Sequence, residues 1–273
     1  MIAFAGNSVL CRIALKHTGI DAASFTSIRL VTGAVVLWAI ANFLRGNGTG
    51  RGNWISAFTL FAYAAGFSFS YVSRTAATGA LLLFGSVQAT MIGHGLWAGE
   101  RFNNQQLVGL MLAFGGLVGL LLPGLSAPPV VGSVLMLTAG VAWGIYSLRG
   151  KGIGNPTRIS AGNFLRAMLF AILLSVLLLS SARLEIVGVL YAIVSGAVAS
   201  GLGYAIWYSV LPVLKSTTAA TVQLCVPVIA ALGGIIVLGE SLTLRFVLAS
   251  VAILGGIALV ILSKSRLNNA QPL

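Results

Sequence analysis

Long, uninterrupted apolar runs fill this sequence and leave only short polar connections between them. Each run is about 17–26 residues long, close to the ~20 residues with which a helix crosses the hydrocarbon core of a bilayer. The connections, such as residues 45–51 and 149–158, carry glycine, proline and basic residues. Strands of a transmembrane barrel would be about 10 residues long and would alternate in polarity, which these runs do not. The runs therefore predict a helical membrane protein.

Ten such runs can be placed along the 273 residues. One span with its connection needs about 25–28 residues, so the length of the chain agrees with this number. The predicted spans are 1–16, 23–44, 54–72, 77–98, 105–122, 130–148, 161–181, 186–211, 217–238 and 244–263. Residues 264–273 are predicted to form a cytoplasmic tail.

Charged residues are scarce, and most of them are basic. They make up 7% of the chain, whereas a soluble domain carries about 25%. Apolar residues make up 58%, which excludes a disordered chain. The net charge of +12 comes from basic residues scattered singly between apolar runs. We therefore expect the lipid bilayer as the surrounding partner and no binding of nucleic acid.

The basic residues between the spans predict the orientation of the chain, because cytoplasmic loops are enriched in Lys and Arg. With both termini in the cytoplasm, nine basic residues fall on the cytoplasmic side and five on the other. The nine are Arg45, Arg51, Arg101, Arg149, Lys151, Arg158, Lys215, Lys264 and Arg266. The five are Arg12, Lys16, Arg74, Arg183 and Arg245. Both termini are therefore predicted to be cytoplasmic.

Residues 78–122 recur later in the chain at a constant offset of 140 residues. The Gly-Glu pair at 99–100 recurs at 239–240, and the Gly-Gly pair at 115–116 recurs at 255–256. The recurring glutamate is informative, because the chain has only four acidic residues. The sequence therefore predicts an internal repeat.

The repeat predicts two halves with opposite orientations in the membrane. Arg29 and Arg166 match at a looser offset of 137, so the halves are residues 1–122 and 130–263 with five spans each. An odd number of spans inverts the second copy. We therefore predict an all-α integral membrane protein of ten transmembrane helices, built as two inverted five-helix repeats that form one transport domain. Inverted repeats are typical of secondary transporters, whose substrate site lies at the repeat interface near the membrane midplane.

The repeated pairs, the matched arginines and Pro227 in the ninth span resemble the EamA type of the drug/metabolite transporter superfamily. This resemblance covers essentially the whole chain, although Val87 stands where the second half has Pro227. Residues 6–12 (GNSVLCR) and 24–29 (SFTSIR) resemble bacterial YddG-like exporters of aromatic amino acids. The resemblance implies an exporter of small metabolites in the bacterial inner membrane that works by alternating access.

From this resemblance we expect small amphipathic substrates, with aromatic and other neutral amino acids favoured. A multidrug, nucleoside or other metabolite carrier of the same fold is the alternative, and a non-transporting membrane scaffold is a further one. Catalysis, a cofactor and a metal are not expected, because no nucleophile–base pair, HExxH pattern or nucleotide motif is present. A monomer is expected, with a dimer as the alternative, because GxxxG patterns at 115–119 and 140–144 allow close helix contact.

Polar and aromatic side chains inside the spans are the candidate substrate contacts, because such groups usually face the interior of a membrane bundle. Contacts between helices or at the membrane interface are their alternative role. The candidates are Asn7, Tyr71, Ser86, Thr90, His94, Trp143, Tyr146, Tyr204, Trp207 and Gln223. Arg29 and Arg166 are possible contacts for a substrate carboxylate, and snorkelling toward lipid headgroups is their favoured alternative.

Overall fold

The structure, a computed structural model, describes residues 1–43, 50–99, 103–122, 129–150, 154–210 and 222–270, with side chains as far as residue 263. Every element in these stretches is a helix. Seven of the described helices are long and apolar enough to cross a membrane. They are α2 (Ala22–Phe43), α4 (Ala76–Trp97), α5 (Asn104–Leu121), α6 (Val130–Arg149), α7 (Pro156–Leu177), the rod Ile186–Val210 and α12 (Leu244–Ala270).

Three further helices lie among these seven: α1 (Ile2–His17), α3 (Trp54–Tyr71) and α11 (Cys225–Leu238). The rod is continuous and consists of α8 (Ile186–Val194), a π-helical segment η2 (Ser195–Leu202) and α9 (Gly203–Val210). A short 3-10 turn, η1 (Leu179–Ser181), follows α7.

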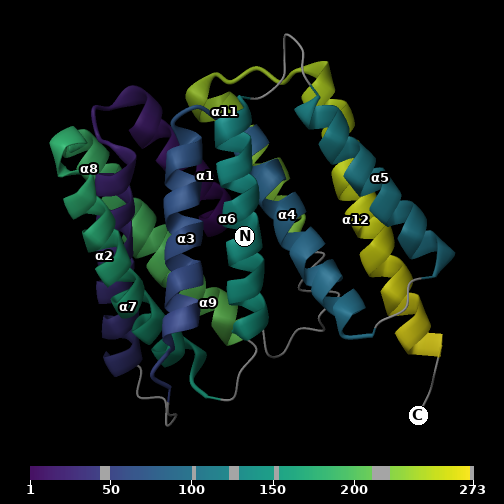
Figure 1. Cartoon of the computed structure of the whole chain (residues 1–273), viewed down its shortest axis with the longest axis horizontal. Coiled ribbons are helices and arrows are strands. Elements are labelled where there is room, and N and C mark those ends of the chain that lie inside the picture. The colour runs from purple at the N-terminus through teal and green to yellow at the C-terminus, as the bar shows by residue number, and fades with distance from the viewer. Residues whose placement is uncertain (44–49, 100–102, 123–128, 151–153, 211–221, 271–273) are drawn as a thin grey trace.

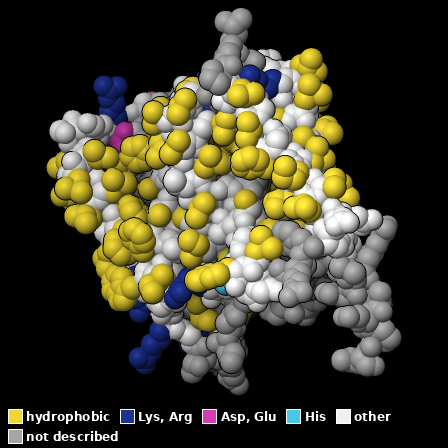
Figure 2. Space-filling view, turned by 45° about the vertical axis from the view of Figure 1, so that its right-hand side comes forward, with side chains coloured by type: hydrophobic (Ala, Val, Ile, Leu, Met, Phe, Trp, Pro, Cys, Tyr) yellow, Lys and Arg dark blue, Asp and Glu magenta, His cyan; other side chains and the backbone are white. Residues whose placement is uncertain are grey.

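The surface of the bundle is that of a protein surrounded by lipid. Large apolar side chains such as Phe43, Ile186 and Ile236 are 85%, 79% and 79% exposed. Figure 2 shows apolar side chains spread over one face of the bundle, with most Lys and Arg side chains toward its two ends. Water would make such a surface costly, whereas lipid tails match it. The chain is therefore an integral, multi-pass membrane protein.

The described helix boundaries agree with most of the predicted spans and correct three of them. The seventh begins at Pro156 instead of residue 161, because the Asn155 side chain caps the helix and proline suits its first position. The last helix continues to Ala270, so most of the predicted tail is helical. In the ninth, α11 begins at Cys225, and residues 217–221 of the prediction lie outside the described part.

The helices stand side by side and run alternately up and down in Figure 1. Helices α5 and α12 form a pair at one edge, where they also contact α4. The main body is held by contacts of α2 with α7, of α6 with α3 and α4, and of α1 with α8, η2 and α11. Segments from the two halves of the sequence are therefore interleaved.

One buried ion pair joins the halves at the upper end of the bundle, where α1, α3 and α11 end and α4 begins. Arg12 Nε donates to Glu240 Oε1 at 3.3 Å, and both residues are 8% exposed. Arg12 Nη1 also donates to the carbonyl oxygens of Tyr71 and Val72, while Glu240 Oε2 accepts from Ala76 N. We call these five residues the upper latch. Because both charges have several partners, their removal from water is compensated.

Helices α2 and η2 approach each other so closely that a side chain is excluded at Gly196. A Cβ on Gly196 would overlap the Arg29 carbonyl oxygen and the Thr32 hydroxyl. Glycine therefore permits the contact that brings η2 against α2 at Arg29.

We predict that Gly196→Ala lowers the thermal stability of the detergent-purified protein, because overpacking of this kind costs about 1–3 kcal/mol. Tryptophan fluorescence during heating measures the change in Tm. The control is Gly115→Ala, where the new Cβ meets no atom within 4 Å and alanine is the better helix former. Equal Tm values for the two variants would contradict the close α2–η2 packing.

Candidate functional site

Arg29 places a positive charge inside the bundle. It projects from α2 and is 2% exposed. Its Nε donates to Ser200 Oγ of η2 at 3.2 Å, and its Nη2 donates to Tyr63 Oη of α3 at 3.0 Å. The guanidinium carbon lies 5.1 Å from the ring centre of Tyr63 and 4.9 Å from that of Phe67, which are cation–π contacts. Arg29 therefore does not snorkel toward the headgroups.

Asn7 extends the polar centre to α1. Its Nδ2 donates to Tyr63 Oη at 3.5 Å, and its Oδ1 accepts from Ser195 Oγ of η2. The Tyr63 hydroxyl thus connects Asn7 with Arg29. Four helical segments, α1, α2, α3 and η2, therefore meet at one hydrogen-bonded centre.

The π-helical segment explains how two serines reach this centre. Ser195 and Ser200 are five residues apart on η2 and are buried. A π-helix hydrogen-bonds residues five apart, so this spacing lies on one face of it. In an ordinary α-helix the same two side chains would diverge by about 140°. Short π-helical segments inside α-helices are frequently found at functional sites.

An aromatic cluster lies next to the polar centre and shares Tyr63 with it. The ring centre of Trp143 is 4.9 Å from that of Tyr63, 5.1 Å from Tyr204 and 5.6 Å from Tyr146. Phe4, Phe164, Trp207 and Tyr208 complete the cluster through edge and tilted contacts. The structure thus brings together Trp143, Tyr146, Tyr204 and Trp207, four of the residues that the sequence singled out.

Several polar atoms in this region have no hydrogen-bond partner among the described residues. They are Arg29 Nη1, Tyr204 Oη, Tyr208 Oη and Gln223 Oε1. Buried polar groups in proteins are nearly always paired, so such a set indicates a place for a ligand or water. Arg29 Nη1 is the strongest donor of the four, because it carries a full charge.

A small cavity of about 20 Å³ reaches this region from the lower end of the bundle. Tyr146 and Tyr208 of the aromatic cluster form part of its wall, together with Arg149 and Asn163. Its size is close to the ~10–15 Å³ that a single water molecule requires. The aromatic rings therefore fill the centre of the bundle in this conformation.

The remaining predicted contacts lie outside the polar centre. Tyr71 is fully buried at the upper end and donates to the Ala76 carbonyl. Ser86 donates to the Leu137 carbonyl, and Thr90 packs against Gly144, so both form the α4–α6 contact. Helix contact was the alternative role for these polar residues.

Three other candidates occupy different environments. His94 is exposed near the lower end of α4 and does not face the bundle interior. Arg166 Nη1 donates to the carbonyl oxygens of Arg51 and Gly162, and its guanidinium lies 5.6 Å from the Trp54 ring centre, so it secures the lower connections. Gln223 is 7% exposed, just before α11. The two arginines matched in sequence thus have different surroundings.

Sequence reasoning left out Tyr63, Ser195, Ser200 and Phe164. Tyr63 was detectable, since it shares a helical stripe with Phe67 and Tyr71 at a spacing of four. Ser195 and Ser200 were not, because only a π-helix places them together. Phe164 resembles any other apolar residue of a span.

Comparisons with known proteins agree with this architecture. The EamA-like transporter family matches residues 130–262. An uncharacterized protein of Pseudomonas aeruginosa is 55% identical over 262 residues, which cover 96% of this chain and 91% of that protein. An uncharacterized transporter of Archaeoglobus fulgidus is 31% identical over 170 residues, which cover 59% of each chain.

A solved crystal structure shares the fold, with a TM-score of 0.69 and 97% of both chains covered at 20% identity. The likeness is structural, and it extends over the first half of the chain as well as the half that the family matches. The relatives and the fold agree with the resemblance of the repeated residues. The chain belongs to the EamA-like transporter family.

Proposed function

We propose that this membrane transporter exports small amphipathic metabolites across the bacterial inner membrane by alternating access, with aromatic and other neutral amino acids as preferred substrates. The observation that carries the proposal is Arg29 Nη1, a buried charged donor without a partner beside a cluster of aromatic rings. A carboxylate next to an aromatic or apolar side chain complements this arrangement.

The packing of the helices supports two inverted repeats. If α1 corresponds to α6, and α3 and α4 correspond to the rod and α11, each contact has a counterpart. Helix α6 packs against α3 and α4, and α1 packs against the rod and α11. The repeated glycines Gly99 and Gly239 both have a positive φ, at 89° and 63°, directly after α4 and α11.

The pair α5 and α12 supports the same relation. A Cβ on Gly116 would meet Ala249 and Ala252 of α12, and a Cβ on Gly256 would meet Gly109 and Ala113 of α5. The partners of the two glycines are themselves 140 or 139 residues apart, since 109 matches 249 and 113 matches 252 within one residue. A two-fold relation between the halves would produce such reciprocal contacts.

Alternating access requires the two ends to close by different contacts. The upper latch closes the upper end through α1, α3, α4 and α11. At the lower end, Arg149 donates to Ser56 Oγ and Asn53 Oδ1, which belong to the same half as the latch's α1 and α3. The upper latch would open when substrate leaves on that side, and the aromatic rings would separate to admit it.

The distribution of described basic residues supports the proposed orientation. Arg51, Arg149 and Arg158 lie at the lower end, where α3 and α7 begin and α6 ends. The C-terminus lies at the same end (Figure 1). The positive-inside tendency then places this end in the cytoplasm.

We predict that Arg29→Gln removes the preference for a substrate carboxylate. In proteoliposome counterflow, the native protein should transport phenylalanine better than phenylalaninamide, which lacks the carboxylate. A hydrogen bond to a charged group contributes about 1.5–3 kcal/mol, so the preference should fall about 10-fold or more in the variant. The ratio of the two substrates on one protein is insensitive to its folded fraction.

Arg166→Gln is the matched control for this experiment, because the same charge is removed at the corresponding sequence position. Arg166 contacts backbone carbonyls at the lower end instead of the polar centre. Its variant should keep the native preference. An unchanged preference in Arg29→Gln, or transport of neither compound by the native protein, would reject the assigned substrate class.

Trp143 lies between Tyr63 and Tyr204, so it is expected to contact an aromatic substrate. We predict that Trp143→Leu weakens phenylalanine transport about 2–10-fold relative to threonine transport, because an aromatic pair contributes about 0.5–1.5 kcal/mol. Competition assays in proteoliposomes measure this ratio. Trp38→Leu is the control, since Trp38 is 56% exposed on the outside of α2. Equal effects of both substitutions would remove Trp143 from the site.

We predict that Glu240→Gln opens the upper end, because Arg12 then loses its charged partner. Cys11 is a native reporter, since it is fully buried next to Arg12. In a Cys225→Ser background, maleimide should label Cys11 about 10-fold faster or more when Glu240 is replaced, the change expected from losing a charged hydrogen bond. Glu185→Gln, an exposed acid at the same end that accepts from Gly19 N, should leave the rate unchanged. Slow labelling in Glu240→Gln would contradict a latch.

A further inference from the structure

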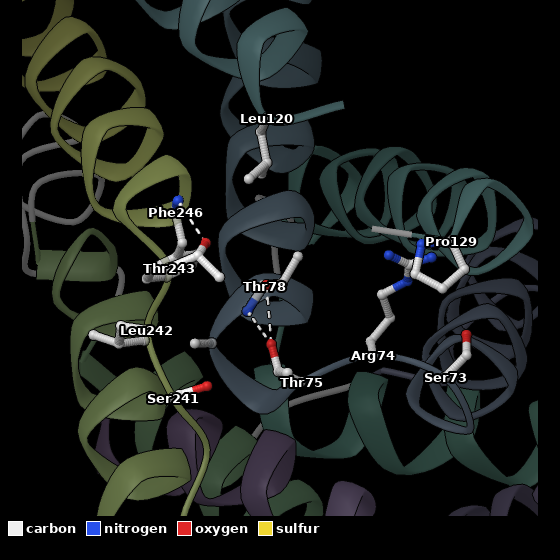
Figure 3. A pocket seen from close by; sticks show the side chains of 11 residues that line it. Ser73, Arg74, Thr75, Thr78, Leu120, Pro129, Ser241, Leu242, Thr243 and Phe246 are labelled. Atoms are coloured by element: carbon white, nitrogen blue, oxygen red, sulfur yellow. Dashed lines mark hydrogen bonds between the residues drawn. The ribbon is translucent and has the colours of Figure 1, made fainter. Parts of the chain in front are cut away.

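A second polar pocket lies at the upper end of the bundle and has no part in the proposed transport site. Its volume is about 140 Å³, enough for several water-sized groups. Figure 3 shows that its walls come from the start of α4, the end of α5, the start of α6 and the connection between α11 and α12. Its polar lining residues are Ser73, Arg74, Thr75, Thr78, Ser241 and Thr243.

Arg74 is the unusual member of this pocket. It is 1% exposed, and none of its three guanidinium nitrogens has a hydrogen-bond partner among the described residues. In Figure 3 its side chain extends from the α3–α4 connection toward Pro129, where α6 begins. The guanidinium also lies against Gly132, where a Cβ would come within 2.8 Å of Arg74 Nε. A buried arginine with three unpaired nitrogens is costly unless an acceptor binds to it.

The surroundings of Arg74 add positive charge instead of neutralising it. Helices α4, α6 and α12 all begin at the pocket, and the start of a helix carries about half a positive charge. The nearest acid in the sequence, Glu240, is already bound to Arg12 and to Ala76 N. Burial with no acid beside it lowers the pKa of Arg74 to about 10, so the group is still charged at neutral pH.

Hydroxyl groups complete the lining opposite the guanidinium. Thr75 Oγ1 accepts from Thr78 N, and Thr243 Oγ1 accepts from Phe246 N, which holds both hydroxyls at helix starts (Figure 3). Arginine, hydroxyl groups and helix starts are the groups with which proteins bind phosphate. Apolar residues on the remaining wall, Leu120, Leu242 and Phe246, set the width of the pocket.

We propose that this pocket binds a phosphate group and that Arg74 is its principal contact. The phosphate belongs to free inorganic phosphate or to the headgroup of a phospholipid, which present the same oxygens. The pocket lies where the helices end, the depth at which headgroups stand. This site is independent of the transported substrate, and its failure would leave the proposed function untouched.

The test measures the Tm of the purified, delipidated protein in two arms. One arm adds sodium phosphate, with sodium chloride at equal ionic strength as the reference. The other adds a short-chain phosphatidylglycerol, with the diacylglycerol of the same chains as the reference. A ligand at about 100 times its Kd should raise Tm by about 5 °C or more. A rise in the first arm identifies free phosphate, and a rise in the second alone identifies the lipid.

Arg74→Gln should lose the rise in whichever arm the native protein shows it. Because each variant is compared with itself, a different starting stability does not affect the result. Arg74→Lys should keep a smaller rise, since lysine cannot bind two oxygens at once, and it serves if Arg74→Gln does not fold. Arg183→Gln is the matched control, because it removes an exposed arginine from the same end. No rise in either arm, or an equal rise in Arg74→Gln, would overturn the proposal.

Discussion

Arg29 is the constraint on which the centre of this protein depends. A bundle surrounded by hydrocarbon cannot leave a guanidinium in its interior without acceptors and polarizable neighbours. Tyr63, Ser200 and the rings of Tyr63 and Phe67 provide them, and each lies on a helix that must approach α2 closely. Gly196 permits that approach. The π-helical turn, the close α2–η2 contact and the meeting of four segments are all consequences of holding this one charge.

The same physical rule distinguishes the three buried arginines. Arg12 has a carboxylate and two carbonyl oxygens, so its interactions are structural. Arg29 retains one unpaired nitrogen beside aromatic rings, and Arg74 retains three beside helix starts and hydroxyls. Unpaired donors of this strength are rare in folded proteins. Aromatic neighbours fit a substrate with a ring and a carboxylate, whereas hydroxyls and helix starts fit a phosphate.

The span boundaries were predictable because hydrocarbon requires continuous apolar runs, and α2, α3, α4 and α5 agree with them within one or two residues. The start of α7 was missed, because Asn155 and Pro156 were interpreted as breakers although together they form a helix start. The aromatic residues Trp143, Tyr146, Tyr204 and Trp207 were predicted to be interior, and they form one cluster. His94 was selected for its chemistry alone, and nothing in its sequence surroundings indicated that it is exposed.

The sequence by itself determined the membrane class and the helical spans, because both follow from local hydrophobicity. It also predicted the repeat, through acids so scarce that one recurring Gly-Glu pair is informative. Only the tertiary structure decided which arginine is interior. Arg29 and Arg166 have equivalent positions in their halves, yet one reaches Tyr63 and Ser200 while the other reaches carbonyls at the lower end. A side chain's partners depend on the neighbouring helices, and no local pattern encodes which helices those are.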